Sequence, residues 1–389
     1  MAKPEIVITS PEEGRLRAEL EKRTDPEALR MKRFLSMQDL SRVNGSPIAE
    51  IAKRIIAIPD FEKFDILKVP EIVSAKESFD PFNFPANHPA RSHSDTYYVN
   101  NDYILRTHTT VMWAYHLALQ QVKEKMAKGE PVGALCHGKV YRKDEIDRRH
   151  MNVFHQIDGW YLARKEEKQI GIPELQDVLV KIAQAIYGKD VEYRFNEDKF
   201  PYTDPSLEME IKVGDPSTPS GQGRWVEVLG SGVVHSKVLE NFGVNSKEWN
   251  GWAFGFGLER LAILSMDLLD IRLLWSEDER VKKQLLLGNK FKEVSKFPPI
   301  TRDISFVVGA DFVPNNYFDI IRDAGGDLVE EVSLLDKYEN AEKFGAGKVS
   351  YTYRIIYRSN ERTLLLEEVA PIQEKIIEET KKQFGAEVR

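Results

Sequence analysis

The sequence predicts an α+β fold in which helices surround an antiparallel sheet. Alternating apolar and polar residues predict strands at 191–195, 207–213 and 224–229, as in an antiparallel sheet with one buried face. Two further strand-like pieces flank a charged loop within residues 140–159, which is typical of a hairpin. An amphipathic helix is expected between Pro173, a start signal, and Gly188, a stop signal.

Composition limits the classes of protein that need to be considered. The 389 residues, 42% of them hydrophobic, are enough for two or three packed domains. The formal net charge is −7, so any nucleic-acid contact must come from local basic patches. The single cysteine, Cys136, excludes an intramolecular disulfide and zinc sites built on paired cysteines.

The same counts suggest where the protein works. One cysteine favours a reducing compartment, and no apolar run approaches the length needed to cross a bilayer. The first ten residues lack the apolar core of a signal peptide, and acidic residues interrupt the basic residues that follow. We therefore expect no membrane association and a cytoplasmic location. The mature form of a mitochondrial matrix or plastid protein would look the same.

The chain is expected to have three parts. Residues 1–75 are charge-rich and helical in pattern, and we expect a packing role for this N-terminal extension rather than chemistry. Residues 76–290 carry the sheet. Residues 296–389 form a separate domain, predicted to be ferredoxin-like from its order of elements. That order is strand 302–308, helix 315–324, strand 328–338, strand 349–358 and helix 368–384.

Residues 251–264 read Gly-Trp-Ala-Phe-Gly-Phe-Gly-Leu-Glu-Arg-Leu-Ala-Ile-Leu and predict a strand that runs into a helix. Gly251, Gly255 and Gly257 would let a flat or phosphorylated ligand approach the backbone. A helix N-terminus carrying Arg260 favours anions. On these residues alone, a tight packing turn with a solvated arginine is an equal alternative.

The hairpin at 140–159 is the second informative segment. Arg142 precedes a charged loop, and Phe154-His155-Gln156 follows it. The alternation places His155 and Gln156 on a sheet that should also bury Phe154. The alternative is an exposed charged hairpin without a ligand.

Together these segments resemble motifs 3 and 2 of the class II aminoacyl-tRNA synthetases, and their wording is similar to that of the phenylalanyl-tRNA synthetases. Residues 88–91 with 95–98 resemble the motif 1 region, where 95–99 reads as a strand start. Residues 107–110 resemble the family's Thr-His-Thr-Ser segment. The C-terminal domain resembles the anticodon-binding module of the single-chain, organellar enzymes.

The resemblance implies a two-step reaction. ATP and L-phenylalanine, with Mg²⁺, would give an aminoacyl-adenylate and pyrophosphate, and the acyl group would pass to the 3′-terminal ribose of tRNA-Phe. Arg142 would bind the α-phosphate and Arg260 the other phosphates. Glu227 is the candidate magnesium ligand. Because the three parts account for nearly the whole chain, we expect no editing domain and therefore release of any tyrosyl-tRNA-Phe without correction.

The site residues follow from the same resemblance. Three positions depart from the family pattern: Trp113 replaces a glutamine, Thr110 replaces a serine and Asp158 replaces a frequent glutamate. The amino-acid-binding residues would be His108, Thr110, Gln156, Asp158, Phe200, Tyr202, Gly230, Gly232, Ala253 and Phe254. The ATP-binding residues would be Arg142, His155, Glu227, Gly257 and Arg260.

The strand at 349–358 is the candidate RNA-binding element. Alternation places three tyrosines on one face and Arg354 and Arg358 on the other, with Lys348 and Arg362 nearby. Rings and guanidinium groups suit a single-stranded RNA loop, although a sheet with one buried and one solvated face explains the alternation equally well.

Assembly and two alternative functions stay open. We expect a monomer, with a homodimer through the motif 1 region as the alternative. One other function is a catalytically reduced relative that only binds RNA. The other is an adenylating enzyme that acts on something besides tRNA.

Overall fold

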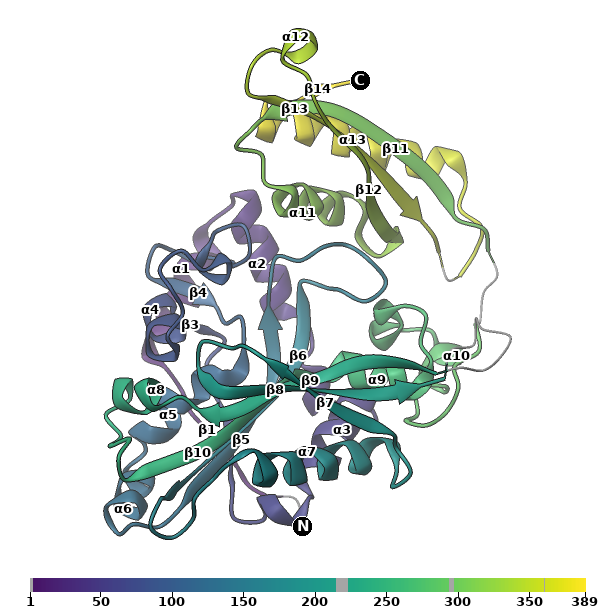
Figure 1. Ribbon diagram of the computed structural model, residues 1–389. Helices are drawn as coiled ribbons and strands as arrows, with labels where there is room; N and C mark the ends of the chain where they lie inside the picture. The colour runs from purple at the N-terminus through teal and green to yellow at the C-terminus, as the bar shows by residue number, and fades with distance from the viewer. Residues whose placement is uncertain (1–2, 215–222, 294–296, 360) are drawn as a thin grey trace. The chain divides into compact units, whose positions relative to one another are not determined.

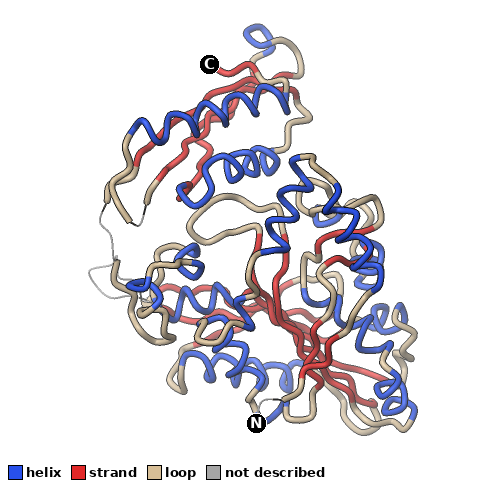
Figure 2. Tube along the Cα trace, turned by 180° about the vertical axis from the view of Figure 1, so that it is seen from behind, coloured by secondary structure: helices blue, strands red, loops and turns tan. Residues whose placement is uncertain are grey.

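The computed structural model of the protein describes residues 3–214, 223–293, 297–359 and 361–389 (Figures 1 and 2). The chain divides into two compact units. The first comprises Met1–Tyr141, Val153–Leu268 and Leu285–Lys290. The second comprises Arg142–Asn152, Leu269–Gln284 and Phe291–Arg389. Within the described ranges, no helix has the length and apolar character needed to cross a membrane.

An eight-stranded sheet in the order β1-β2-β5-β6-β10-β9-β8-β7 is the framework of the first unit. The pairs β1–β2 and β2–β5 are parallel and the other pairs are antiparallel. This arrangement confirms the predicted α+β fold. The strands are β1 (Glu5–Val7), β2 (Asp65–Lys68), β5 (Val132–Tyr141), β6 (Val153–Arg164), β7 (Tyr193–Asp198), β8 (Thr203–Val213), β9 (Arg224–Val234) and β10 (Trp249–Gly257); β3 (Ile72–Ser74) and β4 (Tyr103–Leu105) form a separate pair.

The strands predicted from alternation are present. The predicted strands at 191–195, 207–213 and 224–229 correspond to β7, β8 and β9, and each is longer or shifted by a few residues. The hairpin is also confirmed, because β5 and β6 pair antiparallel with Tyr141 opposite Val153. The hairpin and the strands predicted from alternation therefore belong to one sheet.

Nine α-helices accompany the sheet in the described part of this unit. The helix predicted before Gly188 is α7, which begins where the Gly171 N–H donates to Glu174 Oε2 (3.1 Å). It ends at Gly188, whose φ of +92° favours glycine. The helices are α1 (Pro11–Lys22), α2 (Pro26–Ser36), α3 (Pro47–Ile56), α4 (Ala75–Phe79), α5 (Met112–Ala118), α6 (Gln120–Ala127), α7 (Ile172–Tyr187), α8 (Ser236–Asn241) and α9 (Leu258–Met266).

Two sequence-based expectations about the N-terminal third differ from the structure. The boundary expected at residue 75 does not separate an extension from the sheet, because β1 and β2 are strands of that sheet. Strands of three and four residues are too short for alternation to reveal them. The strand start expected at 95–99 is also wrong: only Tyr98 forms an isolated bridge, with Ile104.

The C-terminal part of the second unit is the predicted ferredoxin-like domain. Its sheet has the order β12-β13-β11-β14, and α11 and α13 lie on one side of it (Figure 2). The predicted strands and helices occur in the predicted order, and the structure adds the helix α12 and the strand β14. The elements of this unit are α10 (Glu279–Lys282), β11 (Ile300–Gly309), α11 (Pro314–Gly325), β12 (Val329–Glu339), α12 (Ala341–Phe344), β13 (Lys348–Tyr357), α13 (Leu366–Phe384) and β14 (Glu387–Val388).

The tyrosines of β13 belong to the core of this domain. Tyr351, Tyr353 and Tyr357 are buried against α11 and α13. Burial raises the pKa of Tyr353 and Tyr357 well above the usual range. The rings are therefore unable to stack on RNA bases. The tyrosines instead form the buried face of the sheet, which was the alternative explanation of the alternation.

The segment that joins β5 to β6 packs onto the same domain. Ile146 is buried in its hydrophobic core, and the Ile146 carbonyl accepts from the Val332 N–H (2.9 Å). The Arg148 guanidinium lies 2.6 Å from a carboxylate oxygen of Glu330, which is almost fully buried. The sequence suggested only a charged loop, because one isoleucine carries no periodic signal.

Candidate active site

A row of residues across four strands forms the centre of the site. Asp158 on β6 lies opposite Gly255 on β10, Gly255 opposite Gly230 on β9, and Gly230 opposite Glu208 on β8. Directly opposed residues in a sheet point to the same face. A Cβ on Gly255 would lie 1.8 Å from Asp158 Oδ1, and one on Gly230 would lie 2.8 Å from the Phe200 ring. The absence of a side chain at Gly255 thus leaves room for the Asp158 carboxylate, and its absence at Gly230 leaves room for the Phe200 ring.

Two threonine hydroxyls hold the Asp158 carboxylate. Thr109 Oγ1 donates to Asp158 Oδ2 at 2.5 Å, and Thr110 Oγ1 donates to the same oxygen at 3.1 Å. Asp158 is 4% exposed and Thr109 is fully buried. Sequence reasoning expected Thr110 to contact the substrate and missed Thr109. The signal was its position next to Thr110 in the segment 107–110.

Gln156 lies two residues before Asp158 on the same face of β6, opposite Gly257. Its Oε1 atom is buried and has no hydrogen-bond partner among the described residues. Buried acceptors are normally paired, so an unpaired one beside a carboxylate fits a ligand that brings hydrogen-bond donors. An ammonium group has that character.

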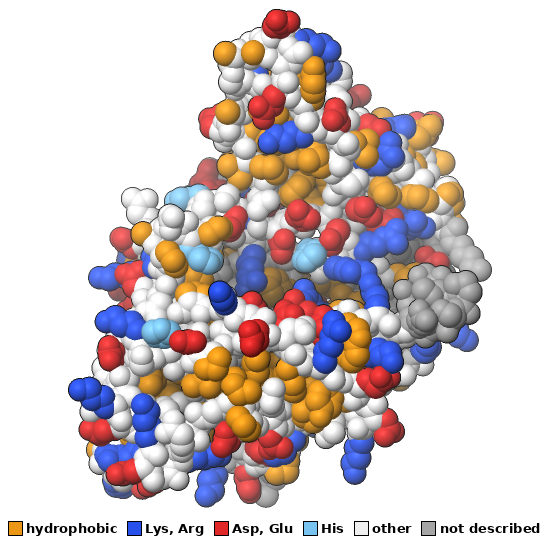
Figure 3. Space-filling model, viewed as in Figure 1, with side chains coloured by type: hydrophobic (Ala, Val, Ile, Leu, Met, Phe, Trp, Pro, Cys, Tyr) orange, Lys and Arg blue, Asp and Glu red, His pale blue; other side chains and the backbone are white. Residues whose placement is uncertain are grey.

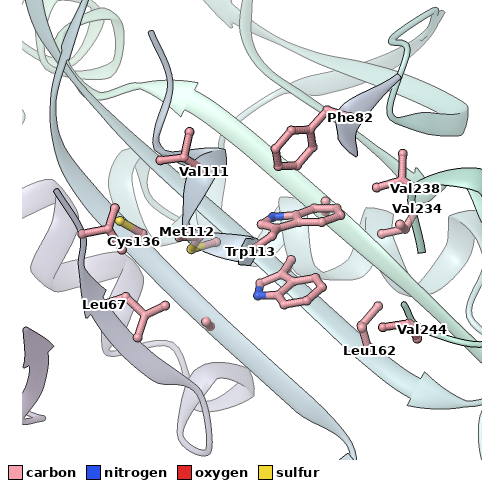
Figure 4. Close-up of a cluster of buried hydrophobic side chains, with 14 of the residues drawn as sticks. Leu67, Phe82, Val111, Met112, Trp113, Cys136, Leu162, Val234, Val238 and Val244 are labelled. Carbon is pink, nitrogen blue, oxygen red and sulfur yellow. The ribbon is translucent and has the colours of Figure 1, made fainter. Parts of the chain in front are cut away.

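Aromatic residues line the next row of this face. Ala253 lies opposite Trp160 on β6 and Gly232 on β9, and is 6% exposed. Trp160 stacks on Trp113 with centroids 4.6 Å apart, and Phe82 meets Trp113 edge to face at 5.4 Å. Figure 4 shows the Phe82 ring beside the Trp113 indole. The apolar Trp113 therefore occupies the position at which the family pattern has a glutamine.

The predicted aromatic segment at 200–202 joins the same cluster. Phe200 and Tyr202 are parallel at 5.7 Å, and Tyr202 lies 5.9 Å from Phe84. Phe84 in turn stacks on the His108 ring at 6.2 Å. The structure therefore brings together most residues predicted to bind the amino acid: His108, Thr110, Gln156, Asp158, Phe200, Tyr202, Gly230, Gly232 and Ala253.

Phe254 does not join them. It follows Ala253 in β10 and therefore points to the opposite face. Its ring packs against Phe61 (6.0 Å) and Trp252 (5.7 Å), and a Cβ on Gly159 would lie 2.4 Å from it. The structure therefore gives no support to its predicted place beside the substrate ring, because adjacent strand residues point to opposite faces.

His155 also points to the opposite face of the sheet. It lies between Phe154 and Gln156 in β6 and is fully buried. Its Nδ1 atom is 2.6 Å from Glu259 Oε1, and its Nε2 atom accepts from the Leu40 N–H at 2.9 Å. Its placement gives no support to the predicted contact with ATP.

Charged and aromatic groups at the β9–β10 end form the candidate nucleotide side. Arg260 is half-exposed on α9, and its Nη1 atom donates to the Glu227 carbonyl (3.2 Å) and lies 3.6 Å from Glu227 Oε1. Phe154 is on the same face as Gln156 and near Gly257. Sequence reasoning expected Phe154 to be buried, but it is partly exposed.

Glu227 on β9 is the candidate magnesium ligand. It lies opposite Glu210, which is bound by Arg194 and Asn196. Among the described residues, no group of three or more acidic, histidine or cysteine side chains could hold a metal ion. Mg²⁺ usually takes one or two carboxylates together with phosphate oxygens, so Glu227 fits such a role beside a bound nucleotide.

The remaining predicted residues lie in the second unit. Arg142 starts the segment after β5, and its N–H donates to the Asn152 carbonyl (3.0 Å). Each arginine predicted to bind tRNA has an acidic partner: Arg354 binds Asp303, Arg358 binds Glu330 and Arg362 binds Glu368. Lys348 is exposed at the start of β13. Basic and acidic side chains are interspersed on the face seen in Figure 3.

Comparison with known families defines the class of protein. Residues 33–285 match the family described as tRNA synthetases class II core domain (F). Residues 295–389 match the ferredoxin-fold anticodon binding domain. A sheet of this kind joined to that domain defines an aminoacyl-tRNA synthetase of class II.

Comparison with individual proteins narrows the class. The chain is 40% identical to the phenylalanine–tRNA ligase, chloroplastic/mitochondrial, of Arabidopsis thaliana, over 85% of this chain and 73% of that protein. It is 35% identical to the mitochondrial phenylalanine–tRNA ligase of Mus musculus (85% and 76%) and 31% identical to that of Saccharomyces cerevisiae (82% and 81%). The chain belongs to the phenylalanine–tRNA ligase family. The resemblance inferred from the motifs is confirmed. The names of these relatives place them in mitochondria or chloroplasts, so they give no support to the expected cytoplasmic location.

Proposed function

We propose that the protein is a phenylalanine–tRNA ligase, which activates L-phenylalanine with ATP and transfers it to the 3′-terminal ribose of tRNA-Phe. The observation that carries this proposal is the sheet face on which Asp158 and Gln156 lie next to Ala253 and an aromatic cluster. The family of the chain supports the same activity.

Groups on this face would recognise the amino acid. The substrate ammonium group would bind the Asp158 carboxylate and satisfy the unpaired Gln156 Oε1. The substrate ring would lie against Ala253 and the rings of Phe200 and Tyr202. Because Thr109 and Thr110 fix Asp158 before the ligand arrives, binding would need little rearrangement.

The first chemical step needs no nucleophilic side chain. A carboxylate oxygen of phenylalanine attacks the α-phosphorus of ATP, the bond from that phosphorus to the bridging oxygen breaks, and pyrophosphate leaves. Arg260 would stabilise the charge on the phosphates, and Phe154 would stack on the adenine beside Gly257. Bound Mg²⁺ would neutralise phosphate charge, with Glu227 as its candidate ligand. The role of Arg142 and the monomeric state stay predictions.

Two assays test the proposal and separate it from the two alternatives. Phenylalanine should stimulate exchange of pyrophosphate into ATP, and the protein should then charge tRNA-Phe. A protein that binds tRNA but shows no exchange would be the RNA-binding relative. Exchange without charging would indicate an adenylating enzyme that acts on another acceptor.

Ala253→Gly should widen the amino-acid specificity. In the family this alanine lies near the para position of the substrate ring, and here its methyl is on the face shared with Asp158. Removing the methyl should admit para-substituted phenylalanines, because an apolar site rejects an added hydroxyl by only about a hundredfold in comparable synthetases. Exchange stimulated by p-chlorophenylalanine should rise at least tenfold, with phenylalanine activity nearly unchanged. Unchanged selectivity would place the ring elsewhere.

Arg354→Ala should weaken tRNA binding without affecting phenylalanine activation. Arg354 and its partner Asp303 are both about 40% exposed, so loss of this pair should not unfold the domain. Removing one phosphate contact should raise the KM for tRNA-Phe a few-fold and reduce its salt dependence. Lys337→Ala, on the neighbouring strand, is the matched control. Equal charging by the Arg354 and Lys337 variants would contradict the assignment of this face of β13.

A further inference from the structure

A buried hydrogen-bond chain behind the sheet connects the N-terminal region to α9. It begins at the 3₁₀ helix η1 (Leu40–Arg42), where the Leu40 N–H donates to His155 Nε2 (2.9 Å). It continues from His155 Nδ1 to Glu259 Oε1 (2.6 Å). Glu259 immediately precedes Arg260 in the first turn of α9. The series of hydrogen bonds therefore ends one residue before Arg260, the cation assigned to the phosphates.

The direction of these hydrogen bonds is determined by the backbone. An amide N–H can only donate, so Nε2 of His155 must be the acceptor. The proton of the neutral ring is then on Nδ1, where it donates to the Glu259 carboxylate. Leu40 thereby selects the tautomer that can bind Glu259.

Glu259 depends on His155 for its place in the interior. The carboxylate is 3% exposed, and its two oxygens also accept from the His155 backbone N–H at 2.9 and 2.8 Å. A carboxylate is costly to bury unless donors of this kind surround it. His155 thus fastens the first turn of α9 to β6.

Charged groups hold the η1 end of this series of hydrogen bonds in place. Asp39 accepts from Ser41 and from Arg42 (2.6 Å), and Arg42 also binds Glu5 of β1. Although burial alone would raise it, the pKa of Asp39 is held far below its usual range by the Arg42 guanidinium and by the hydrogen bond from Ser41. His137 contacts Ser41 (2.9 Å), and burial lowers the pKa of its imidazole to about 3. The position of η1 relative to β5 and β6 is therefore well determined.

We infer that His155 is a positioning residue for Arg260, and that the backbone N–H of Leu40 is part of the same device. Residues 39–42 would then set the geometry of the nucleotide side from behind the sheet. This inference rests on the proposed function, since it assigns to Arg260 the phosphates of ATP.

Two variants of His155 distinguish its hydrogen bond to Glu259 from its hydrogen bond to Leu40. Asparagine can place an amide donor near the Nδ1 position and keep the bond to Glu259. Glutamine reaches the Nε2 position instead, so it can accept from Leu40 but loses the donor to Glu259. His155→Gln should raise the Kd for ATP and lower kcat for pyrophosphate exchange by about tenfold each, with KM for phenylalanine within twofold. For His155→Asn, the Kd for ATP, the kcat for exchange and the KM for phenylalanine should all stay within threefold of the values of the unaltered protein. Equal losses in both variants would overturn the inference.

Leu40 offers a second, independent pair. Proline suits the first position of a helix, and Asp39 before it is already extended, with φ −79° and ψ 93°. Leu40→Pro removes the N–H and should raise the Kd for ATP about fivefold, whereas Leu40→Ala keeps the N–H and should lower only stability. A larger effect of alanine than of proline on the Kd would contradict the assigned role.

A double mutant shows whether His155 acts through Arg260. In an Arg260→Lys background, His155→Gln should lower kcat by less than threefold, because the two changes affect one geometry. Additive losses would overturn the inference. The Kd for ATP, measured by calorimetry, needs neither phenylalanine nor tRNA. Absence of phenylalanine-dependent exchange in the unaltered protein would therefore refute the proposed function, while the order of the ATP affinities would still test His155.

Discussion

Arg260→Ala is expected to lower phenylalanine-dependent pyrophosphate exchange by at least about a hundredfold. The guanidinium lies at the start of α9 beside Glu227, where it can neutralise charge that develops on the leaving pyrophosphate. Removing one preorganised cation of this kind costs on the order of 3 kcal/mol in the transition state. Stopped-flow or exchange kinetics at saturating phenylalanine would measure the loss.

The fold should tolerate this change. Arg260 is half-exposed, and an ion pair with the equally exposed Glu227 contributes little to stability. Arg280→Ala is the matched control, since Arg280 is also an exposed arginine with one carboxylate partner, Asp278. Both variants should unfold at the temperature of the unaltered protein. Exchange at a near-normal rate in Arg260→Ala would refute the motif assignment.

Asp158→Asn is expected to raise the KM for phenylalanine by about a hundredfold. The asparagine has nearly the same shape, but it loses the negative charge that would bind the substrate ammonium group. Its amide can still accept a hydrogen bond from Thr109 or Thr110, so the sheet should keep its geometry. Exchange assays with varied phenylalanine, at saturating ATP, would measure this effect.

The controls for Asp158 concern the other substrate and the neighbouring glycine. KM for ATP should change less than threefold, because Asp158 is assigned to the amino acid. Gly255→Ala should impair phenylalanine binding as well, since a Cβ there would overlap Asp158 Oδ1. An asparagine variant with an unchanged KM for phenylalanine would mean that the ammonium group binds elsewhere.

Local patterns were sufficient for much of the fold. Strand alternation predicted β7, β8 and β9, and helix signals at Pro173 and Gly188 predicted α7. The order of strands and helices predicted the ferredoxin-like domain. These signals are local because the pleat of a strand and the turn of a helix repeat within a few residues.

The sequence by itself determined which neighbouring residues share a face. Alternation puts Gln156 and Asp158 on one face of a strand and His155 on the other, but the family resemblance nevertheless led us to assign Phe254 to the amino acid together with Ala253. Only the tertiary structure decided which face is the candidate site, since that depends on the pairing of β6 with β10 and of β10 with β9. The same holds for the Leu40–His155 hydrogen bond, the threonine contacts of Asp158 and the burial of Ile146. Each joins residues far apart in the chain, so no local period encodes it.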